Sequence, residues 1–226
     1  PAYAFQIDQE KAFADNDIFA YENFTTRDST SGKWLALGLF QKLLRRYAIQ
    51  SAGDQTVQRA RLVDVDLRRL QFVSNNSVLE NRNVLYINAL DRLYRSTPNH
   101  PIQSEVGYQL AIALYASEGE NKAANTKKAV ALCEEAMRLH PGSHGAKLCE
   151  ELLRQIKMVI LNIQVEDVNL PGKSSLVRLE FRNLTKAYVK VVRGSSDEVN
   201  KVSQLRYEER IPKLLQLKEV QRKEWT

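Results

Sequence analysis

The sequence predicts a multidomain α+β protein, with an antiparallel α-helical array over residues 1–157 and a partial antiparallel β-sandwich over residues 158–226. Two observations carry this prediction. Apolar residues recur at spacings of three and four along the first part, as they do on one face of a helix, and they alternate with polar residues after residue 158. With 226 residues, 43% of them hydrophobic, the chain is long enough to bury a core.

The helical part is divided by turn-rich stretches such as SAGD (51–54), STPNHP (96–101) and EGENKAAN (118–125). Each segment between them has a single apolar stripe, which a lone helix cannot bury, so we expect neighbouring helices to pack as antiparallel pairs. Residues 1–32 show no clear period and end in the turn-rich TTRDSTSG. The predicted helices cover about residues 33–48, 56–73, 83–95, 103–117, 126–140 and 143–157.

The middle helices resemble a tetratricopeptide repeat. Two alanines, Ala89 and Ala129, are each followed twelve residues later by a proline, as a repeating helix pair requires. Ile112, however, stands where the motif has a small residue, and the loop that follows is longer than the motif allows. We therefore expect a tetratricopeptide-like array, with a non-repeating helical bundle as the alternative. The matching residues are Tyr108, Ala111, Tyr115, Ala129, Cys133, Ala136 and Pro141.

The second part has the period of β-strands. Residues 160–168, 175–183 and 187–194 are expected to form an antiparallel meander with one covered face and one solvated face. A polar, helix-prone excursion follows around 196–216, and residues 218–225 are expected to return as a strand. Because three or four strands make half a sandwich with an exposed edge, we expect the natural protein to continue or another molecule to cover the edge.

The charge pattern disfavours nucleic acid as a partner. The net charge is +6, but acidic and basic residues alternate, as in EERIPK (208–213), which is typical of a solvated surface. No apolar run approaches the roughly 20 residues that a membrane-spanning helix needs. The chain begins at Pro1 without a methionine, so we expect an excised or processed segment, which leaves earlier removal of an export signal open.

The order of these segments resembles the amino-terminal part of bacterial alpha-2-macroglobulin-like proteins. The residues that carry the resemblance are the strands VEDVNLPGK (165–173), LVRLEFRN (176–183) and KAYVKVV (186–192), which follow a helical region. In that family, a helical region precedes the first macroglobulin-like β-sandwich. The resemblance covers most of the chain from about residue 60 onward.

The resemblance implies a segment of a large exported protein, periplasmic or on the cell surface, that traps or blocks proteases. Some members also attach to the protease through a thioester in a Cys-Gly-Glu-Gln sequence. The two cysteines here lie in LCEEA and LCEEL, and no bait segment is visible. The segment is therefore expected to be a non-catalytic scaffold whose partners are the rest of the parent polypeptide, another protein or, through the parent, proteases.

The stretch LCEEAMRLHPGSHGAKLC (132–149) holds both cysteines and two of the three histidines. His140 and His144 have the spacing of a zinc pair, but Pro141 and Gly142 break the helix between them, and neither cysteine has a close partner of its own kind. A zinc site is therefore disfavoured. Cys133 and Cys149 lie on neighbouring helices, and export would favour a disulfide between them, with two buried free thiols as the alternative.

No cofactor motif and no nucleophile–base pair are visible, and His100 lies in a proline turn where we expect it to be solvated, so an enzyme is not expected. The alternative function is a helical-repeat adaptor that binds a peptide or a protein partner. Gln109 and Lys128 are the side chains expected to be exposed for such a role.

Overall fold

The computed structural model describes residues 4–49, 54–166 and 176–225. The chain divides into two compact units, Pro1–Ile156 and Lys157–Thr226, next to the position where the sequence changes period. It is an α+β protein, which confirms the predicted class. No helix in the described ranges has both the length and the apolar character needed to cross a bilayer.

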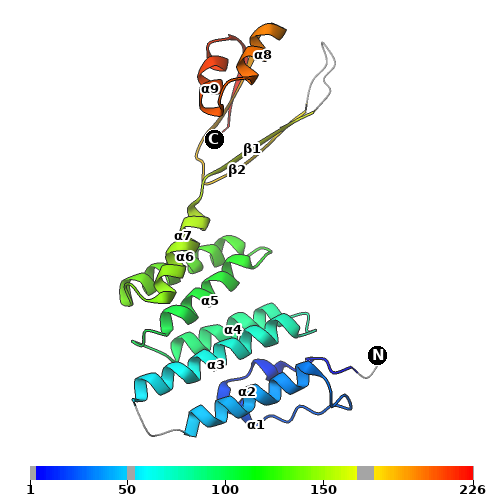
Figure 1. Ribbon diagram of the computed structural model, residues 1–226, viewed down its shortest axis with the longest axis vertical. Coiled ribbons are helices and arrows are strands. Elements are labelled where there is room, and N and C mark those ends of the chain that lie inside the picture. Colours follow the sequence, from blue (N-terminus) through cyan, green and yellow to red (C-terminus); the bar gives the residue numbers. More distant parts are fainter. Residues whose placement is uncertain (1–3, 50–53, 167–175, 226) are drawn as a thin grey trace. The chain divides into compact units, whose positions relative to one another are not determined.

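The first unit is helical (Figure 1). Consecutive helices from α2 to α6 pack against one another in chain order. The helix expected near residue 126 begins earlier, at Lys122, so half of the predicted polar loop is helical. The bounds are η1 Glu10–Phe13, α1 Asn16–Tyr21, α2 Gly32–Ile49, α3 Gln55–Asn76, α4 Arg82–Arg95, α5 Gln103–Ala116, α6 Lys122–Leu139 and α7 His144–Lys157.

The amino-terminal segment shows no clear period in the sequence, yet the structure forms two short helices within its described residues. Its short helices η1 and α1 pack on α2, α3 and α4. Phe13 and Phe19 are at most 2% exposed, and Ile7 forms a parallel bridge with Ser77 at the end of α3. Elements this short show no helical period in the sequence, but their aromatic side chains extend the helical core.

Two glycines set the corner between α6 and α7. Gly142 has a φ of 77°, a left-handed conformation that ends a helix and that other residues rarely adopt. Gly145 brings the start of α7 against the start of α5, since a Cβ there would lie 2.3 Å from the Ser104 carbonyl carbon. The corner that contains both histidines is thus shaped by backbone contact.

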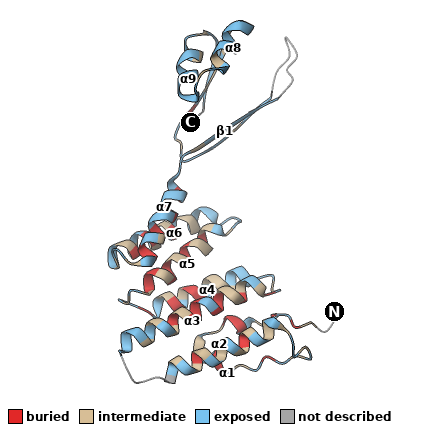
Figure 2. Ribbon diagram, viewed as in Figure 1, coloured by how far each residue is buried: buried red, intermediate tan, exposed pale blue. Residues whose placement is uncertain are grey.

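The positions that match the tetratricopeptide pattern include four fully buried small residues, namely Ala111, Ala129, Cys133 and Ala136. Small buried residues let helices approach closely, and they belong to one continuous core that runs through the helical unit (Figure 2). The repeat geometry itself stays a prediction.

The second unit contains two separate two-stranded antiparallel sheets in its described residues, and the predicted three-stranded meander is wrong. β1 (Ile160–Val165) pairs with β2 (Val177–Arg182), whereas β3 (Ala187–Arg193) pairs with β4 (Lys218–Trp225). The helices α8 (Ser196–Ser203) and α9 (Tyr207–Leu215) fill the connection between β3 and β4.

The reason lies at the end of β2. Asn183 has a φ of 57°, and its side chain bonds to the carbonyl of Met158, which turns the chain aside at the base of the hairpin. The hydrogen-bonding partner of β3 is therefore the last strand rather than β2. The expected covered face is also missing, because nearly all residues of β1 and β2 are exposed (Figure 2).

Candidate functional site

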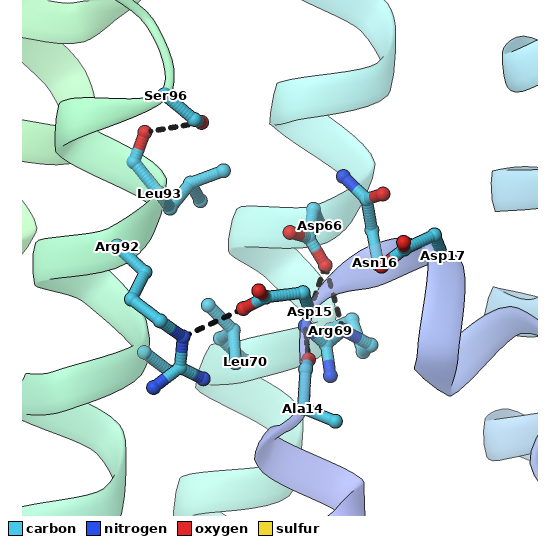
Figure 3. Close-up of a pocket in the computed structure, with 11 residues that line it drawn as sticks. Ala14, Asp15, Asn16, Asp17, Asp66, Arg69, Leu70, Arg92, Leu93 and Ser96 are labelled. Atoms are coloured by element: carbon cyan, nitrogen blue, oxygen red, sulfur yellow. Dashed lines mark hydrogen bonds and ion pairs between the residues drawn. The ribbon is translucent and has the colours of Figure 1, made fainter.

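A polar cavity of about 310 Å³ lies where the amino-terminal segment meets α3 and α4 (Figure 3). Its walls carry the acids Asp15, Asp17 and Asp66 and the arginines Arg69 and Arg92. Such a gathering of charges is the first place to look for chemistry. Whether any of these charged groups is available for chemistry depends on the partners that it already has.

Arg69 is fully used by the fold. Its side chain is 1% exposed and forms an ion pair with Asp66, with 2.6 Å between Nη2 and Oδ1. It also donates hydrogen bonds to the carbonyl oxygens of Ala12 and Ala14, at 2.7 and 3.0 Å. The guanidinium lies over the ring of Phe19, 4.4 Å from its centroid. One buried side chain thus fixes η1 and α1 to α3.

Arg92 and Asp15 pair with each other, and the Asp17 carboxylate accepts a hydrogen bond from the Ile18 amide at 2.9 Å. Arg92 donates to Asp15 at 2.6 Å (Figure 3) and to the Phe13 carbonyl at 2.8 Å. Burial raises the pKa of Asp66, while the charge of Arg69 opposes that rise. Burial also lowers the pKa of Arg69. Because Arg69 and Arg92 both bind carboxylates and backbone carbonyls, the cavity anchors the amino-terminal segment to α3 and α4.

The sequence does carry a signal for this anchor. Val63, Asp66, Leu70 and Val73 lie at helical spacing on the buried stripe of α3, so an acidic residue stands inside an apolar stripe. Arg69 follows it by three residues, which lets the two charges meet on one face. The neighbouring Arg68 pairs instead with Asp64 and is exposed, and the two arginines are indistinguishable by residue type.

The predicted cysteine pair is brought together. Cys133 on α6 and Cys149 on α7 are both fully buried free thiols. A hydrogen bond with Cys149, together with burial, raises the pKa of Cys133. The Cys133 thiol is therefore a poor nucleophile, because the thiolate is the reactive form, whereas the same hydrogen bond lowers the pKa of Cys149. The disulfide stays a prediction, and the structure supplies the proximity that it requires.

The histidines do not join the cysteines. His140 caps the end of α6, half-buried, while His144 begins α7 on the surface. In the described ranges, no three His, Cys, Asp or Glu residues are arranged to hold a metal ion. His100, expected to be solvated, is half-buried, with Nε2 2.9 Å from the Thr56 carbonyl oxygen and Nδ1 accepting from the Ile102 amide.

The two side chains proposed for an adaptor role lie in different hollows. Gln109 lines a hollow of about 180 Å³ with residues of α3 and α7. Lys128 lines a hollow of about 400 Å³ between α4, α5 and α6. The structure therefore does not bring Gln109 and Lys128 into one groove.

The β1–β2 hairpin has an apolar face without a cover. Its register pairs Leu161 with Phe181, Ile163 with Leu179, and Val165 with Val177. Because alternate residues point to the same side of a strand, these six side chains share one face. The exposed fractions are 52% for Leu161, 53% for Ile163, 52% for Val165, 40% for Val177 and 43% for Phe181.

Comparison with protein-family models, with curated proteins and with solved structures finds no match to this chain. The resemblance in the strand sequences is therefore a hypothesis about the family. The structural features that bear on function are the apolar face of the hairpin and the hollows of the helical unit.

Proposed function

We propose that this chain is a non-catalytic scaffold and interaction segment of a large exported alpha-2-macroglobulin-like protein. In this proposal, the β1–β2 hairpin is one layer of a β-sandwich, and the second layer comes from the rest of the parent polypeptide or from another protein. The observation that carries it is the uncovered apolar face of the hairpin. The role of the parent in trapping or inhibiting proteases rests on the resemblance of the quoted strands.

The physical argument concerns the stability of the hairpin. Five of the six apolar side chains are 40–53% exposed, and the face presents roughly 400 Å² of apolar surface, the size of the largest patch on a typical monomer, which is often functional. A two-stranded hairpin is marginal in water, and a second layer over its hydrophobic face would stabilise it. The opposite face carries Asn162, Gln164, Arg178 and Glu180, which suit solvent. One side of the hairpin thus favours a partner layer and the other favours water.

The test compares amide hydrogen exchange of β1 and β2 in this chain and in the full-length natural polypeptide. We expect fast exchange in the chain alone and at least tenfold slower exchange in the full-length protein. Ile163→Lys, on the apolar face, should abolish that protection, whereas Gln164→Lys, on the opposite face of the same strand, should preserve it. Equal exchange rates in the two proteins would contradict the proposal.

A further inference from the structure

The outer face of α2 is apolar at a place where a stack of helices normally presents a polar surface. Helix α2 packs on α1 and α3 and lies at one end of the helical unit (Figure 1). The terminal helices of stacked arrays need a polar outer face for solubility. On α2, however, Leu35 and Leu39 are 53% and 58% exposed. A partner surface is therefore expected to cover these two leucines.

Five exposed residues of α2 form one narrow row along the helix. They recur at alternating spacings of three and four, which is the spacing of a seam between two helices rather than of a broad apolar face. The residues on either side of the row, such as Ala36 and Arg45, are half-buried. The row is therefore suited to one further helix laid along it. Its members are Gly32, Leu35, Leu39, Lys42 and Arg46.

The charges at the two ends of the row lack ionic partners. Among the described residues, the structure gives Lys42 and Arg46 neither an ion pair nor a side-chain hydrogen bond. Just before the other end of the row, the Asp28 carboxylate accepts a hydrogen bond from the Thr30 hydroxyl at 3.1 Å, and it has no cation beside it within the described ranges. The partner surface is thus expected to pair with cations at one end and with an acid at the other.

We propose that a second copy of this chain covers the row, with the two α2 helices packed antiparallel about a twofold axis. Leu35 of each copy then packs on Leu39 of the other copy. Lys42 lies opposite Gly32, which has no side chain, and no atom lies within 4 Å of the position that a Cβ would take there. One face thus supplies both halves of an isologous contact.

Charge decides the orientation of the two helices. A parallel pair would place Lys42 and Arg46 beside the same cations of the other copy, and like charges repel. The antiparallel pair separates these cations, and it brings Arg46 level with the residues that precede the other copy's Gly32, where Asp28 lies. An exposed pair of this kind adds little affinity, but it favours one register over the others.

The size of the patch sets the strength of the dimer. Tyr21 of α1 borders the row, since the Arg45 guanidinium lies 5.8 Å from the centroid of its ring, and it is 72% exposed. Together with Leu35 and Leu39, it presents roughly 400 Å² of mainly apolar surface, about half of what each partner buries in a standard stable complex. We therefore expect a weak dimer, with a dissociation constant on the order of 100 µM.

Sedimentation velocity of the full chain tests the dimer. Every protein in the experiment carries Ile163→Lys, which prevents association through the apolar face of the β1–β2 hairpin and leaves α2 unchanged. The two proposals share no residue, so either can fail alone. We expect the sedimentation coefficient to rise toward that of a dimer between about 5 and about 500 µM protein. A monomer over this whole range would overturn the proposal.

Leu39→Glu places a carboxylate against the leucines of the other copy. Because a twofold interface contains each substitution twice, association should weaken at least tenfold. Val84→Glu on α4 is the matched control, since Val84 is 59% exposed on a different helix. Both sites are more than half exposed, so the helical circular dichroism of both variants should be unchanged. Equal association of the two variants would rule out the α2 contact.

Arg46→Ala tests the orientation. Loss of the pair with Asp28 should weaken an antiparallel dimer about two- to threefold. In a parallel dimer, the same substitution would remove a contact between like charges and would tighten association. Lys127→Ala on α6 is the control for the change in net charge, because Lys127 is exposed on a helix outside the contact. Tighter association of Arg46→Ala than of Lys127→Ala would overturn the antiparallel arrangement.

Discussion

The two units of this chain differ in how they hold their apolar residues. In the helical unit, side chains such as Leu37, Leu90 and Val106 are fully buried in a continuous core. Among the described residues of the second unit, Ala187 alone is fully buried. Since burial of apolar surface supplies most folding free energy, the core of the helical unit stabilises that unit, whereas the β unit buries little apolar surface of its own.

The largest expected effect concerns the anchor inside the helical unit. Arg69→Ala leaves the carboxylate of Asp66 buried without its partner and frees two carbonyls, so the free energy of unfolding should fall by about 3–5 kcal/mol. Urea unfolding followed by helical circular dichroism measures it.

Arg68→Ala is the control for that experiment. Arg68 is the adjacent residue in the sequence, yet its pair with Asp64 is exposed, and the loss should be at most about 0.5 kcal/mol. If Arg69→Ala does not fold, Arg69→Lys keeps the charge and should give a measurable intermediate loss. Equal losses for Arg68→Ala and Arg69→Ala would contradict the assigned anchor.

The second effect concerns the thiols at the other end of the helical unit. Oxidised glutathione should convert Cys133 and Cys149 to an intramolecular disulfide, with loss of two hydrogen atoms from the intact mass. A bridge closing a loop of this length should raise the free energy of unfolding by about 3 kcal/mol. Cys149→Ser should abolish both changes, and recovery of glutathione adducts or linked dimers alone would refute the pairing.

The third effect tests the close approach of α7 to α5. Gly145→Ala would place a Cβ 2.4 Å from the backbone nitrogen of Glu105, so α7 must shift, and we expect a loss of about 1–3 kcal/mol. Gly38→Ala on α2 is the matched control, since no atom lies within 4 Å of its Cβ, and it should stabilise by up to about 1 kcal/mol. If Gly145→Ala and Gly38→Ala lowered the free energy of unfolding by similar amounts, the contact would be disproved.

Much of this fold follows from local pattern, and the failures have physical reasons. The helices from α2 to α7 follow from their apolar stripes and the turn residues between them. The strands also lie where alternation predicts them, but alternation does not predict which strands pair. Alternation shows which residues share a face and not which strand is the neighbour, so the excursion around 196–216 was predicted but the pairing of β4 with β3 was not.

The candidate sites show the same limit. Gln109 and Lys128 were predicted to be exposed from their places on helices, but which hollow each of them lines depends on how the helices pack. From the sequence, Arg69 would be placed on the surface, because the backbone carbonyls that it binds lie more than fifty residues away in the chain. The proximity of Cys133 and Cys149 was foreseeable, because both lie on apolar stripes of consecutive helices.

The smallest expected effect is the sharpest test of the contrast between the units. In this chain alone, Ile163→Ala removes atoms that are already half in water, so the free energy of unfolding of the helical unit should change by less than about 0.5 kcal/mol. Leu90→Ala, at a site that is 0% exposed, should cost about 2–5 kcal/mol in the same assay. A large loss for Ile163→Ala would mean that the apolar face of β1–β2 is already covered in the chain alone, and the need for a second layer would disappear.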